Sequence, residues 1–349
     1  MSAAVVTGAG RALPASYEQG EVWDGYFAEQ YAGLRAAERV FKAAGARRRH
    51  AVVNPVDEDI SRWGTGARME RYVTEGLPLG KQAVAGALDA AGLAPGDVGQ
   101  FAVVTCTGYA TPGLDIRLAS DLGMPLGLQR LLIGHMGCYA ALPGLAAVSD
   151  FVTARSRPAV LLCLELTSLH VQPAVQELEQ VVTHALFSDA AAAVVVEPGA
   201  SRGRRVAGMV ARTDHATADH MTWDVTDLGF RMGLSPRVPD VLARHVGGVV
   251  EELLTEAGLR IEDVAGWAVH PGGPRILDVV RDELGLSEEQ MGASRRVLAE
   301  HGNCSSATVL LVLEELADVD GPVVAMAFGP GLTLYATLLL PASSSPAGG

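Results

Sequence analysis

Runs of apolar residues with little polar alternation are the most distinct pattern along this chain. Residues 157–165 and 190–197 are almost wholly apolar, and 101–106 and 128–133 are shorter runs of the same kind. Strands that are apolar on both faces are typical of sheets that are covered by helices on both sides. We therefore expect these four segments to be buried strands.

Between these strands, apolar residues recur at the spacing of one helical face. The segments 80–91, 247–257 and 307–316 fit this spacing and predict helices. Alternation of helices with buried strands indicates a layered α/β fold. The 40 glycines and the low aromatic content of 5% favour close packing of helices on sheets.

Two distant parts of the chain repeat each other at one fixed offset. Residues 91–104 and 257–270 are identical at seven of fourteen positions, and they lie 166 positions apart. The same offset places segment 135–141 on segment 301–307, where His, Cys and Ala coincide without a gap. This period is too long for a solenoid repeat, so it predicts two similar halves.

The expected organisation is therefore a duplicated chain. Residues 1–200 form the predicted N-terminal half, which carries Cys138, and 201–341 form the C-terminal half, which carries His270 and Asn303. A length of 349 residues suits two domains. The Ser-, Pro- and Gly-rich segment 342–349 is expected to be a disordered tail.

Composition excludes several classes of protein. A net charge of −13 argues against nucleic acid as the main partner, because phosphate binding needs clustered Lys and Arg. No apolar run approaches the ~18 residues that a membrane span needs, and the N-terminus lacks the pattern of a signal peptide, so we expect a cytoplasmic protein. The four cysteines lack CxxC spacing, and we expect free thiols and no metal site.

Cys138 stands where a buried strand passes into a helix. If the strand ends at Gly137 and the helix begins at Tyr139, unpaired backbone N–H groups and the helix dipole lower the pKa of the thiol. Gly134 and Gly137 would let the backbone turn and leave the sulfur open to a substrate. A buried structural cysteine is the alternative interpretation.

Two further side chains are candidates to work with this thiol. His270 ends the predicted strand 267–270 and precedes ProGlyGlyPro, which forces a turn at the strand end where α/β folds gather functional groups. Asn303 occupies the second-half position equivalent to Gly137. A carboxamide donates an N–H, which suits an oxyanion hole. Cys, His and Asn together indicate thioester acyl transfer with stabilisation of an enolate. We interpret His135 and His301 as structural.

Three basic residues near the N-terminus form a local exception to the acidic composition. Arg35, Arg39 and Lys42 fall at i, i+4 and i+7, on one face of a predicted helix. They form either a solvated helix face or a local anion site.

Several segments of this sequence resemble the type III polyketide synthases, the chalcone synthase-like enzymes of the thiolase superfamily. The resemblance spans roughly residues 30 to 340, in order, and rests on segments 134–141, 270–278, 302–310 and 328–333, with further matches at 105–115 and 185–192. It implies a thiolase-like layered αβαβα fold made of two duplicated halves.

The resemblance also implies roles for individual residues. Cys138 matches the nucleophile that takes a starter acyl group from coenzyme A. His270 and Asn303 match the pair that hold the malonyl thioester carbonyl during loss of carbon dioxide. Phe187 matches a gate residue, whereas Met232 stands where the family has a second gate phenylalanine. Phe230, two positions away, is a candidate to compensate.

Further residues are assigned by the same resemblance. The implied cavity wall consists of Cys106, Thr107, His170, Trp223, Met232 and Ser305. Thr111 matches a residue that crosses a homodimer interface into the partner's cavity. The coenzyme A contacts implied are Arg35, Arg39, Lys42, Gly272 and Gly273. Acyl-CoA and malonyl-CoA are the implied substrates, with no resident cofactor, and the implied products are pyrones or resorcinols.

Three other interpretations are open. An initiating ketoacyl-carrier-protein synthase shares Cys, His and Asn, but HisProGlyGlyPro speaks against it. An acyltransferase of the same fold that performs no extension would use the same three residues. A thiol-based redox sensor or scaffold would explain Cys138 alone and gives no reason for His270 or Asn303.

Overall fold

The fold is built on a mixed sheet of nine strands. The computed structural model describes residues 2–342, so the tail expected over 342–349 lies outside the described residues except for Ala342. The strand order is β11-β12-β13-β8-β1-β7-β6-β4-β5. In that order the strands are Gly266–Val269, Val323–Gly329, Thr333–Pro341, Arg204–Thr213, Ala4–Ala12, Ala190–Pro198, Ala159–Glu165, Gln100–Thr105 and Gln129–Gly134.

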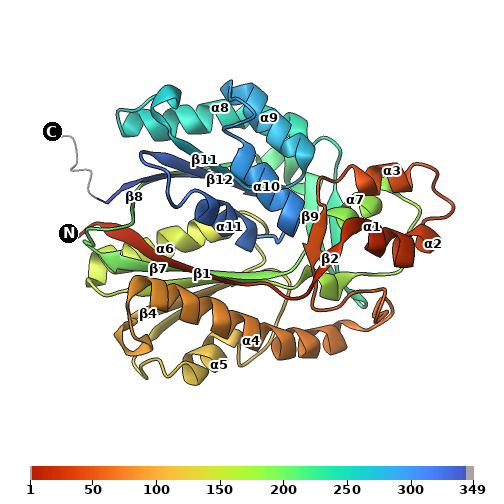
Figure 1. Cartoon of the computed structure of the whole chain (residues 1–349), viewed down its shortest axis with the longest axis horizontal. Helices are drawn as coiled ribbons and strands as arrows, with labels where there is room; N and C mark the ends of the chain where they lie inside the picture. Colours follow the sequence, from red (N-terminus) through yellow and green to blue (C-terminus); the bar gives the residue numbers. More distant parts are fainter. Residues whose placement is uncertain (1, 343–349) are drawn as a thin grey trace.

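The sheet consists of two parts that meet at a narrow seam. Strands β1, β7, β6, β4 and β5 come from the first 200 residues, and β8, β13, β12 and β11 come from the remainder. Only two residue pairs join them, Val5 with Arg205 and Val6 with Arg204. The two parts lie one above the other with helices between them (Figure 1), which confirms the expected α/β layering.

Helices form the other three layers. In Figure 1, α4 and α5 cover one outer face, α8 and α9 cover the opposite outer face, and α6 and α11 lie between the two parts of the sheet. The helices are α1 Gln19–Val22, α2 Ala28–Gln30, α3 Ala37–Lys42, α4 Thr65–Ala91, α5 Leu114–Asp121, α6 Ala141–Arg155, α7 Leu178–Leu186, α8 Val238–Glu256, α9 Pro274–Leu284, α10 Gly292–His301 and α11 Ala307–Glu315. No helix within residues 2–342 is long and apolar enough to cross a membrane.

Burial along β6 shows why its sequence is continuously apolar. Leu161 and Cys163 pack into the cluster around α6 and α11, whereas Leu162 and Leu164 pack into the cluster under α4. Successive side chains of a strand point to opposite faces, and both faces are covered here. The prediction of a buried strand at 157–165 is confirmed.

The internal repeat is visible in the positions of the elements. Helices α6 and α11 begin at Ala141 and Ala307, which are 166 positions apart. Helices α4 and α8 are followed by left-handed glycines with the same separation, Gly92 and Gly258. The domain boundary after residue 200 itself stays a prediction.

Strand β5 breaks the repeat. At the offset of 166 its residues correspond to 295–300, which lie inside the helix α10. β5 is also an edge strand whose side chains are largely exposed, among them Leu132 at 48%. The expectation that 128–133 is a buried strand is therefore wrong, because within residues 2–342 no further strand pairs with β5 on its outer side.

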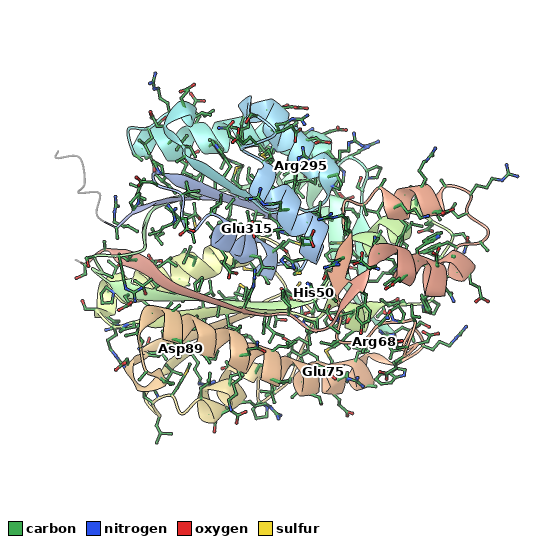
Figure 2. The ribbon with its side chains drawn as sticks, in the orientation of Figure 1. His50, Arg68, Glu75, Asp89, Arg295 and Glu315 are labelled. Atoms are coloured by element: carbon green, nitrogen blue, oxygen red, sulfur yellow. The ribbon has the colours of Figure 1, made fainter. Side chains whose placement is uncertain are left out.

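Two small sheets lie beside the main sheet, at the right of Figure 1. One pairs β2 (Ser16–Glu18) with β3 (Arg48–His50), and the other is the hairpin of β9 (Met221–Thr226) and β10 (Gly229–Leu234). Arg68, labelled in Figure 2, is fully buried near this hairpin. Its guanidinium donates to the carbonyl oxygens of Ile60 (2.7 Å), Trp63 (2.8 Å) and Val171 (3.0 Å), so it joins two loops through their backbones.

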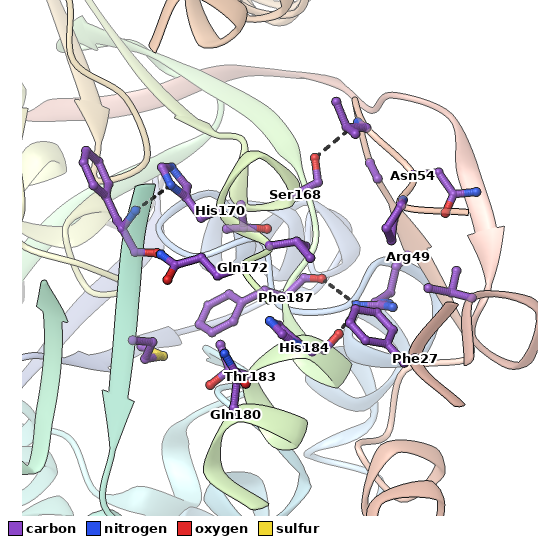
Figure 3. Close-up of a pocket in the computed structure, with 18 of the residues that line it drawn as sticks. Phe27, Arg49, Asn54, Ser168, His170, Gln172, Gln180, Thr183, His184 and Phe187 are labelled. Carbon is purple, nitrogen blue, oxygen red and sulfur yellow. Dashed lines mark hydrogen bonds between the residues drawn. The ribbon is translucent and has the colours of Figure 1, made fainter. Parts of the chain in front are cut away.

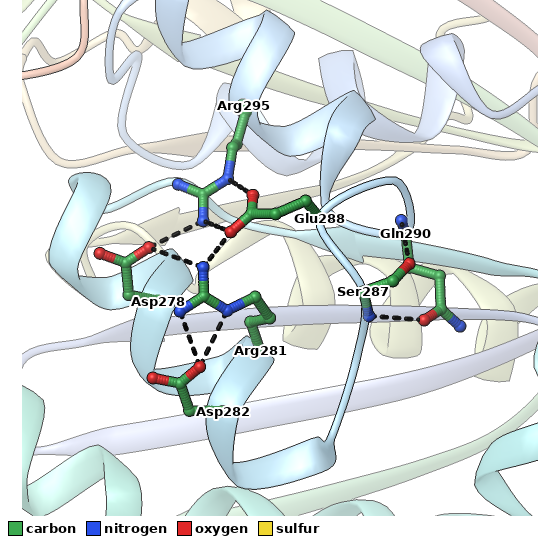
Figure 4. A network of polar contacts seen from close by, with 7 residues as sticks. All are labelled: Asp278, Arg281, Asp282, Ser287, Glu288, Gln290 and Arg295. Atoms are coloured by element: carbon green, nitrogen blue, oxygen red, sulfur yellow. Dashed lines mark hydrogen bonds and ion pairs between the residues drawn. The ribbon is translucent and has the colours of Figure 1, made fainter.

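Ion pairs on the surface connect α9 to α10 (Figure 4). Arg295 bonds Asp278 at 2.7 Å and Glu288 at 2.8 Å, and Arg281 bonds the same two carboxylates. Single exposed pairs contribute little to stability, but a shared network fixes the geometry of the loop that contains Glu288. This loop leads into α10, whose C-terminal end precedes Asn303.

Candidate active site

Cys138, His270 and Asn303 line one cavity of about 490 Å³. The cavity lies between α3, α7, the end of β10, the start of α8 and the start of α9 with the two glycines before it, and its wall is mostly apolar. The three side chains come from the ends of different elements in both halves of the chain. The structure therefore brings together the three residues that the sequence singled out.

Cys138 lies in a tight turn that precedes α6. Gly137 has a φ of +79°, and a Cβ there would lie 2.5 Å from Cδ of Pro330. We expected the helix to begin at Tyr139, but it begins at Ala141. The sulfur is buried, and burial raises the pKa of the Cys138 thiol to about 12, although bonds from Ser305 and Asn303 oppose the rise. The expected low pKa is therefore wrong, since desolvation outweighs the distant helix end.

His270 follows β11 directly and is 1% exposed. Its backbone N–H donates to the carbonyl of Met326 at 2.8 Å, which fixes the residue at the edge of the sheet. Neither ring nitrogen has a hydrogen-bond partner within residues 2–342. Burial lowers the pKa of His270 to about 3, so the imidazole is neutral near pH 7. A neutral ring offers one donor and one acceptor to whatever enters the cavity.

Asn303 is held on both sides of its backbone. Its N–H donates to Leu186 O (2.8 Å), and its carbonyl accepts from Ser188 N (2.9 Å), so it pairs with Phe187 as in a parallel sheet. The side-chain Oδ1 accepts from Ser305 N at 2.9 Å. The oxygen is thereby engaged, and the amide nitrogen is the group that can donate toward the Cys138 sulfur and the cavity.

Phe187 and Met232 stand where three cavities adjoin. Both line the large cavity, an inner chamber of about 20 Å³, and a third cavity of about 70 Å³. The inner chamber contains Cys138 and is lined by the expected wall residues Cys106, Thr107, Trp223 and Ser305. This position between compartments fits a gate at Phe187, with a flexible methionine opposite it.

His170 does not line the chamber with Cys138, contrary to expectation. It lines the third cavity, which Figure 3 shows with His170 and Phe187 labelled. Both ring nitrogens are engaged, Nε2 with Thr107 O (2.7 Å) and Nδ1 with Phe230 N (2.9 Å). His170 therefore supports the wall from behind.

Phe230 does not compensate for the methionine at the gate. Its ring stacks on His170 with centroids 4.5 Å apart, and it lines only the third cavity. Phe230 and Met232 share a face of the alternating strand and both line the third cavity, but of the two only Met232 also reaches the large cavity and the inner chamber.

Sequence reasoning missed Glu165, a fully buried carboxylate behind the inner chamber. It accepts from Ser306 Oγ (2.5 Å), Thr107 Oγ1 (2.8 Å) and Cys106 N (3.0 Å), and burial raises the pKa of Glu165. The available signal was a lone Glu at the end of the apolar run 157–165. A charged residue in such a run is rarely buried unless other groups pair with it or form hydrogen bonds to it.

The basic residues expected at the coenzyme A site lie outside the cavity. Arg35 precedes α3 and is not on its face, and Arg39 and Lys42 are exposed. Lys42 pairs with Glu38 at 2.6 Å. From α3 the cavity is lined by its apolar side, whereas Gly272, Gly273 and Arg275 line the mouth. Arg275 is a cation that sequence reasoning missed.

Thr111 also lies away from the cavity of its own chain. It is exposed, and its hydroxyl donates to Tyr109 Oη at 3.4 Å. Tyr109 is itself 63% exposed. A role for Thr111 in the cavity of a second copy stays a prediction.

Comparison with known protein families shows to which family this chain belongs. Residues 2–200 match the N-terminal domain of the chalcone and stilbene synthases, and residues 209–342 match their C-terminal domain. The chain belongs to the chalcone and stilbene synthase family. It is a type III polyketide synthase, a condensing acyltransferase that uses malonyl-CoA. The interpretation as an initiating ketoacyl synthase is set aside by these matches.

The relatives of this type III polyketide synthase make different products. A 1,3,6,8-tetrahydroxynaphthalene synthase of Streptomyces peucetius is 38% identical, over 86% of this chain and 82% of the relative. An alpha-pyrone synthesis polyketide synthase-like protein of Mycobacterium tuberculosis is 31% identical, over 86% and 81%. The crystal structure of 1,3,6,8-tetrahydroxynaphthalene synthase from Streptomyces coelicolor superposes with a TM-score of 0.91 at 27% identity, over 97% of this chain and 99% of the other, consistent with the thiolase-like fold.

Proposed function

We propose that Cys138 of this polyketide synthase is loaded with a starter acyl group from an acyl-CoA. The sulfur attacks the thioester carbonyl, a new carbon–sulfur bond forms, and the bond to the coenzyme A sulfur breaks. Because the resting thiol is protonated, loading needs a base. The imidazole of His270, which lines the same cavity, takes the thiol proton in step with the attack on the thioester, so that no free thiolate–imidazolium pair has to form, and passes it to the departing coenzyme A thiolate.

Extension then uses malonyl-CoA. The bond to the malonyl carboxylate breaks, carbon dioxide leaves, and the electron pair forms an enolate on the thioester. Asn303 Nδ2 and the N–H of His270 donate to the enolate oxygen, which is most strongly stabilised in a dry site. The enolate carbon attacks the acyl-Cys138 carbonyl, a carbon–carbon bond forms, and the Cys138 sulfur leaves.

The observation that carries this proposal is the set of open hydrogen-bonding groups in one enclosed cavity. His270 is almost fully buried, and neither ring nitrogen has a partner among residues 2–342, although buried polar groups are nearly always bonded. Asn303 has its oxygen tied to Ser305, which leaves its N–H₂ group as the donor. A substrate oxygen that binds between these groups would satisfy them.

The proposed product is a short polyketide released as an α-pyrone or as an aromatic ring such as a resorcinol. The inner chamber is small, about 20 Å³, because Trp223 fills one side and donates from Nε1 to Cys106 O at 2.6 Å. A wall that is fixed by a hydrogen bond favours few extensions. Relatives named for a naphthalene and for pyrones support products of this class.

We further propose a cytoplasmic homodimer that meets through β5, with Thr111 of each copy reaching the other's cavity. Exposed apolar side chains gather near this edge, at Ile116, Leu126 and Leu132. An open strand edge with apolar side chains is a surface that a second chain can cover. At the mouth of the cavity, Arg39 and Arg275 are proposed contacts for the coenzyme A phosphates, with Arg35 and Lys42 nearby and the backbone of Gly272 and Gly273 against the pantetheine arm.

Two variants separate the proposed roles. Cys138→Ala removes the acyl acceptor, so condensation should cease while malonyl-CoA alone is still decarboxylated to acetyl-CoA. Asn303→Ala removes an oxyanion donor, and decarboxylation should fall about 100-fold or more, whereas iodoacetamide still alkylates Cys138. Mass spectrometry of products from short and long acyl-CoA starters reports both activities. Acyl transfer with no extension would establish the non-extending acyltransferase, and full condensation by Cys138→Ala would refute the mechanism.

A further inference from the structure

Two histidines lie directly behind Asn303 and bond each other. His50 ends β3, and His301 ends α10, two positions before Asn303. His50 Nε2 and His301 Nδ1 are 3.0 Å apart, and the ring centroids are separated by 5.2 Å. His50 is 8% exposed, and its position in the interior is marked in Figure 2.

A third group determines which ring nitrogens of this pair carry a proton. His50 Nδ1 lies 3.0 Å from Pro14 O, and a carbonyl oxygen can only accept. Nδ1 of His50 therefore carries the hydrogen and Nε2 is an acceptor, so His301 Nδ1 is the donor between the rings. Burial lowers the pKa of both residues, to about 4 for His301, with Arg11 acting in the same direction and Glu300 and Glu315 opposing it at His301. Both rings are neutral near pH 7.

The pair closes a ring of hydrogen bonds that includes Asn303. His50 N donates to Ser188 Oγ (2.7 Å), and Ser188 N donates to Asn303 O (2.9 Å). From Asn303 the chain runs back through residue 302 to His301, whose ring returns to His50. Strand β3, segment 186–189 and the end of α10 are thereby held together, with Phe187 and Asn303 on the side of the cavity.

Without the contact between the rings, the end of α10 loses its side-chain bond to the end of β3. It keeps the ion pair of Arg47 with Glu300 and the backbone bond from Arg47 N to Ala299 O (2.7 Å). Asn303 keeps its backbone bonds to Leu186 and Ser188, but this joined segment is then free to shift relative to β3 by the slack that the ring contact removes. An oxyanion donor must be placed to within a fraction of an ångström, and a displacement of 1 Å can cost about 100-fold in rate.

We propose that His50 and His301 are positioning residues for Asn303, which act by holding the end of α10 against β3. This inference rests on the proposed role of Asn303 in decarboxylation. It assigns no proton transfer to either histidine, because neither lines the large cavity or the inner chamber that contain Cys138.

The test compares His301→Leu with His301→Asn in the full chain. Leucine removes the donor, so kcat for malonyl-CoA decarboxylation should fall about 10- to 100-fold with KM changed less than about twofold. The amide nitrogen of asparagine lies near the place of Nδ1 and should restore most of kcat. The rate of Cys138 alkylation by iodoacetamide should stay within about twofold of the wild type in both variants, because the thiol is held by a different loop.

Substitution of His50 tests the same contact from its other side. His50→Leu should lower kcat to the same degree, and the double variant should be no slower than either single variant, since all three break one contact. If His301→Leu decarboxylates at the wild-type rate while Asn303→Ala does not, the positioning role is wrong and the proposed function stands. If Asn303→Ala itself decarboxylates normally, the proposed function fails. Equal losses of alkylation and decarboxylation would show a merely structural role and overturn the inference.

Discussion

At the scale of single residues, the approach of the chain to Cys138 depends on an uncommon backbone conformation. Two of the three residues that precede Cys138 have positive φ angles, +59° at His135 and +79° at Gly137. Left-handed conformations cost roughly 1–2 kcal/mol for residues other than glycine. The turn therefore combines one strained residue with one glycine, and it aims the sulfur into the cavity beside Pro330.

Gly137→Ala tests this turn. The new Cβ would lie 2.5 Å from Pro330 Cδ and would require a left-handed alanine, so the free energy of unfolding should fall by about 1–3 kcal/mol, and condensation should fall at least tenfold. Urea denaturation and product formation measure the two effects. Gly134→Ala is the matched control, because Gly134 ends β5 and a Cβ there has only Thr105 O within 4 Å, at 3.9 Å. Equal losses in both variants would contradict this account.

The residue scale also shows what the sequence could and could not predict. Cys138, His270 and Asn303 were predicted because each follows a strand or turn that the pattern marks, and because the repeat places Asn303 opposite Gly137, the residue before Cys138. Glu165 and the His50–His301 pair were missed, since their partners lie far away in the sequence. The pKa of Cys138 was misjudged because burial depends on tertiary packing, which no local pattern reports.

At the scale of elements, the β9–β10 hairpin forms a wall of the inner chamber. Three bonds attach it to the backbone around Cys106 and Thr107: Trp223 Nε1 to Cys106 O (2.6 Å), His170 Nε2 to Thr107 O (2.7 Å) and Phe230 N to His170 Nδ1 (2.9 Å). Since His170 both donates and accepts, it must be neutral to make both bonds. Burial lowers the pKa of His170 to about 4, which keeps it neutral near pH 7.

His170→Leu should release this hairpin. Thr107 O and Phe230 N lose their partner in a buried place, so the free energy of unfolding should fall by about 2–4 kcal/mol. The Phe230 amide should exchange its hydrogen with solvent much faster than in the wild type. His215→Leu is the control, because His215 is exposed just before β9, and it should stay within about 0.5 kcal/mol. Unchanged exchange at Phe230 would mean that the hairpin is held by other contacts.

Elements with a clear hydrophobic pattern in the core were predicted well, whereas elements at the edge of the sheet or at the surface were not. β6 and α11 were evident because most of their side chains are buried in the apolar core. β5 has an apolar sequence but an open edge, and the sequence of one chain does not show whether a neighbour lies there. The predicted helical face of Arg35, Arg39 and Lys42 failed since α3 has only six residues and starts after Arg35.

At the scale of the whole molecule, several histidines are buried in neutral form. Burial lowers the pKa of His184 and His270 to about 3 and of His170 and His301 to about 4, against ~6.5 in an unfolded chain. Below pH 6.5 the unfolded chain therefore binds more protons at these sites than the folded one. Their contribution makes the folded state less stable as the pH falls. Glu165 and Asp189, whose pKa values burial raises, act in the opposite direction.

His184→Phe isolates one of these groups. The ring of His184 packs on Phe27 (4.9 Å) and shares a hydrogen bond with Tyr31 Oη (2.8 Å), and phenylalanine keeps the packing. Between pH 6 and pH 5 the loss of stability should be smaller in the variant by about 1 kcal/mol per pH unit. Urea midpoints across this range in wild type and variant measure the difference. Parallel curves would show that His184 is protonated equally in both states.

One consequence of the seam between the two parts of the sheet concerns the ends of the polypeptide. Ala4 pairs with Pro198, Pro341 pairs with Arg204, and Ala342 N donates to Gly203 O at 3.0 Å. Both ends of the described chain thus meet beside the same turn, at the left of Figure 1, while α3 and α7 of the cavity mouth lie at the right. Cargo attached at either end, whether a solid support or a second enzyme, would leave the passage for thioesters unobstructed.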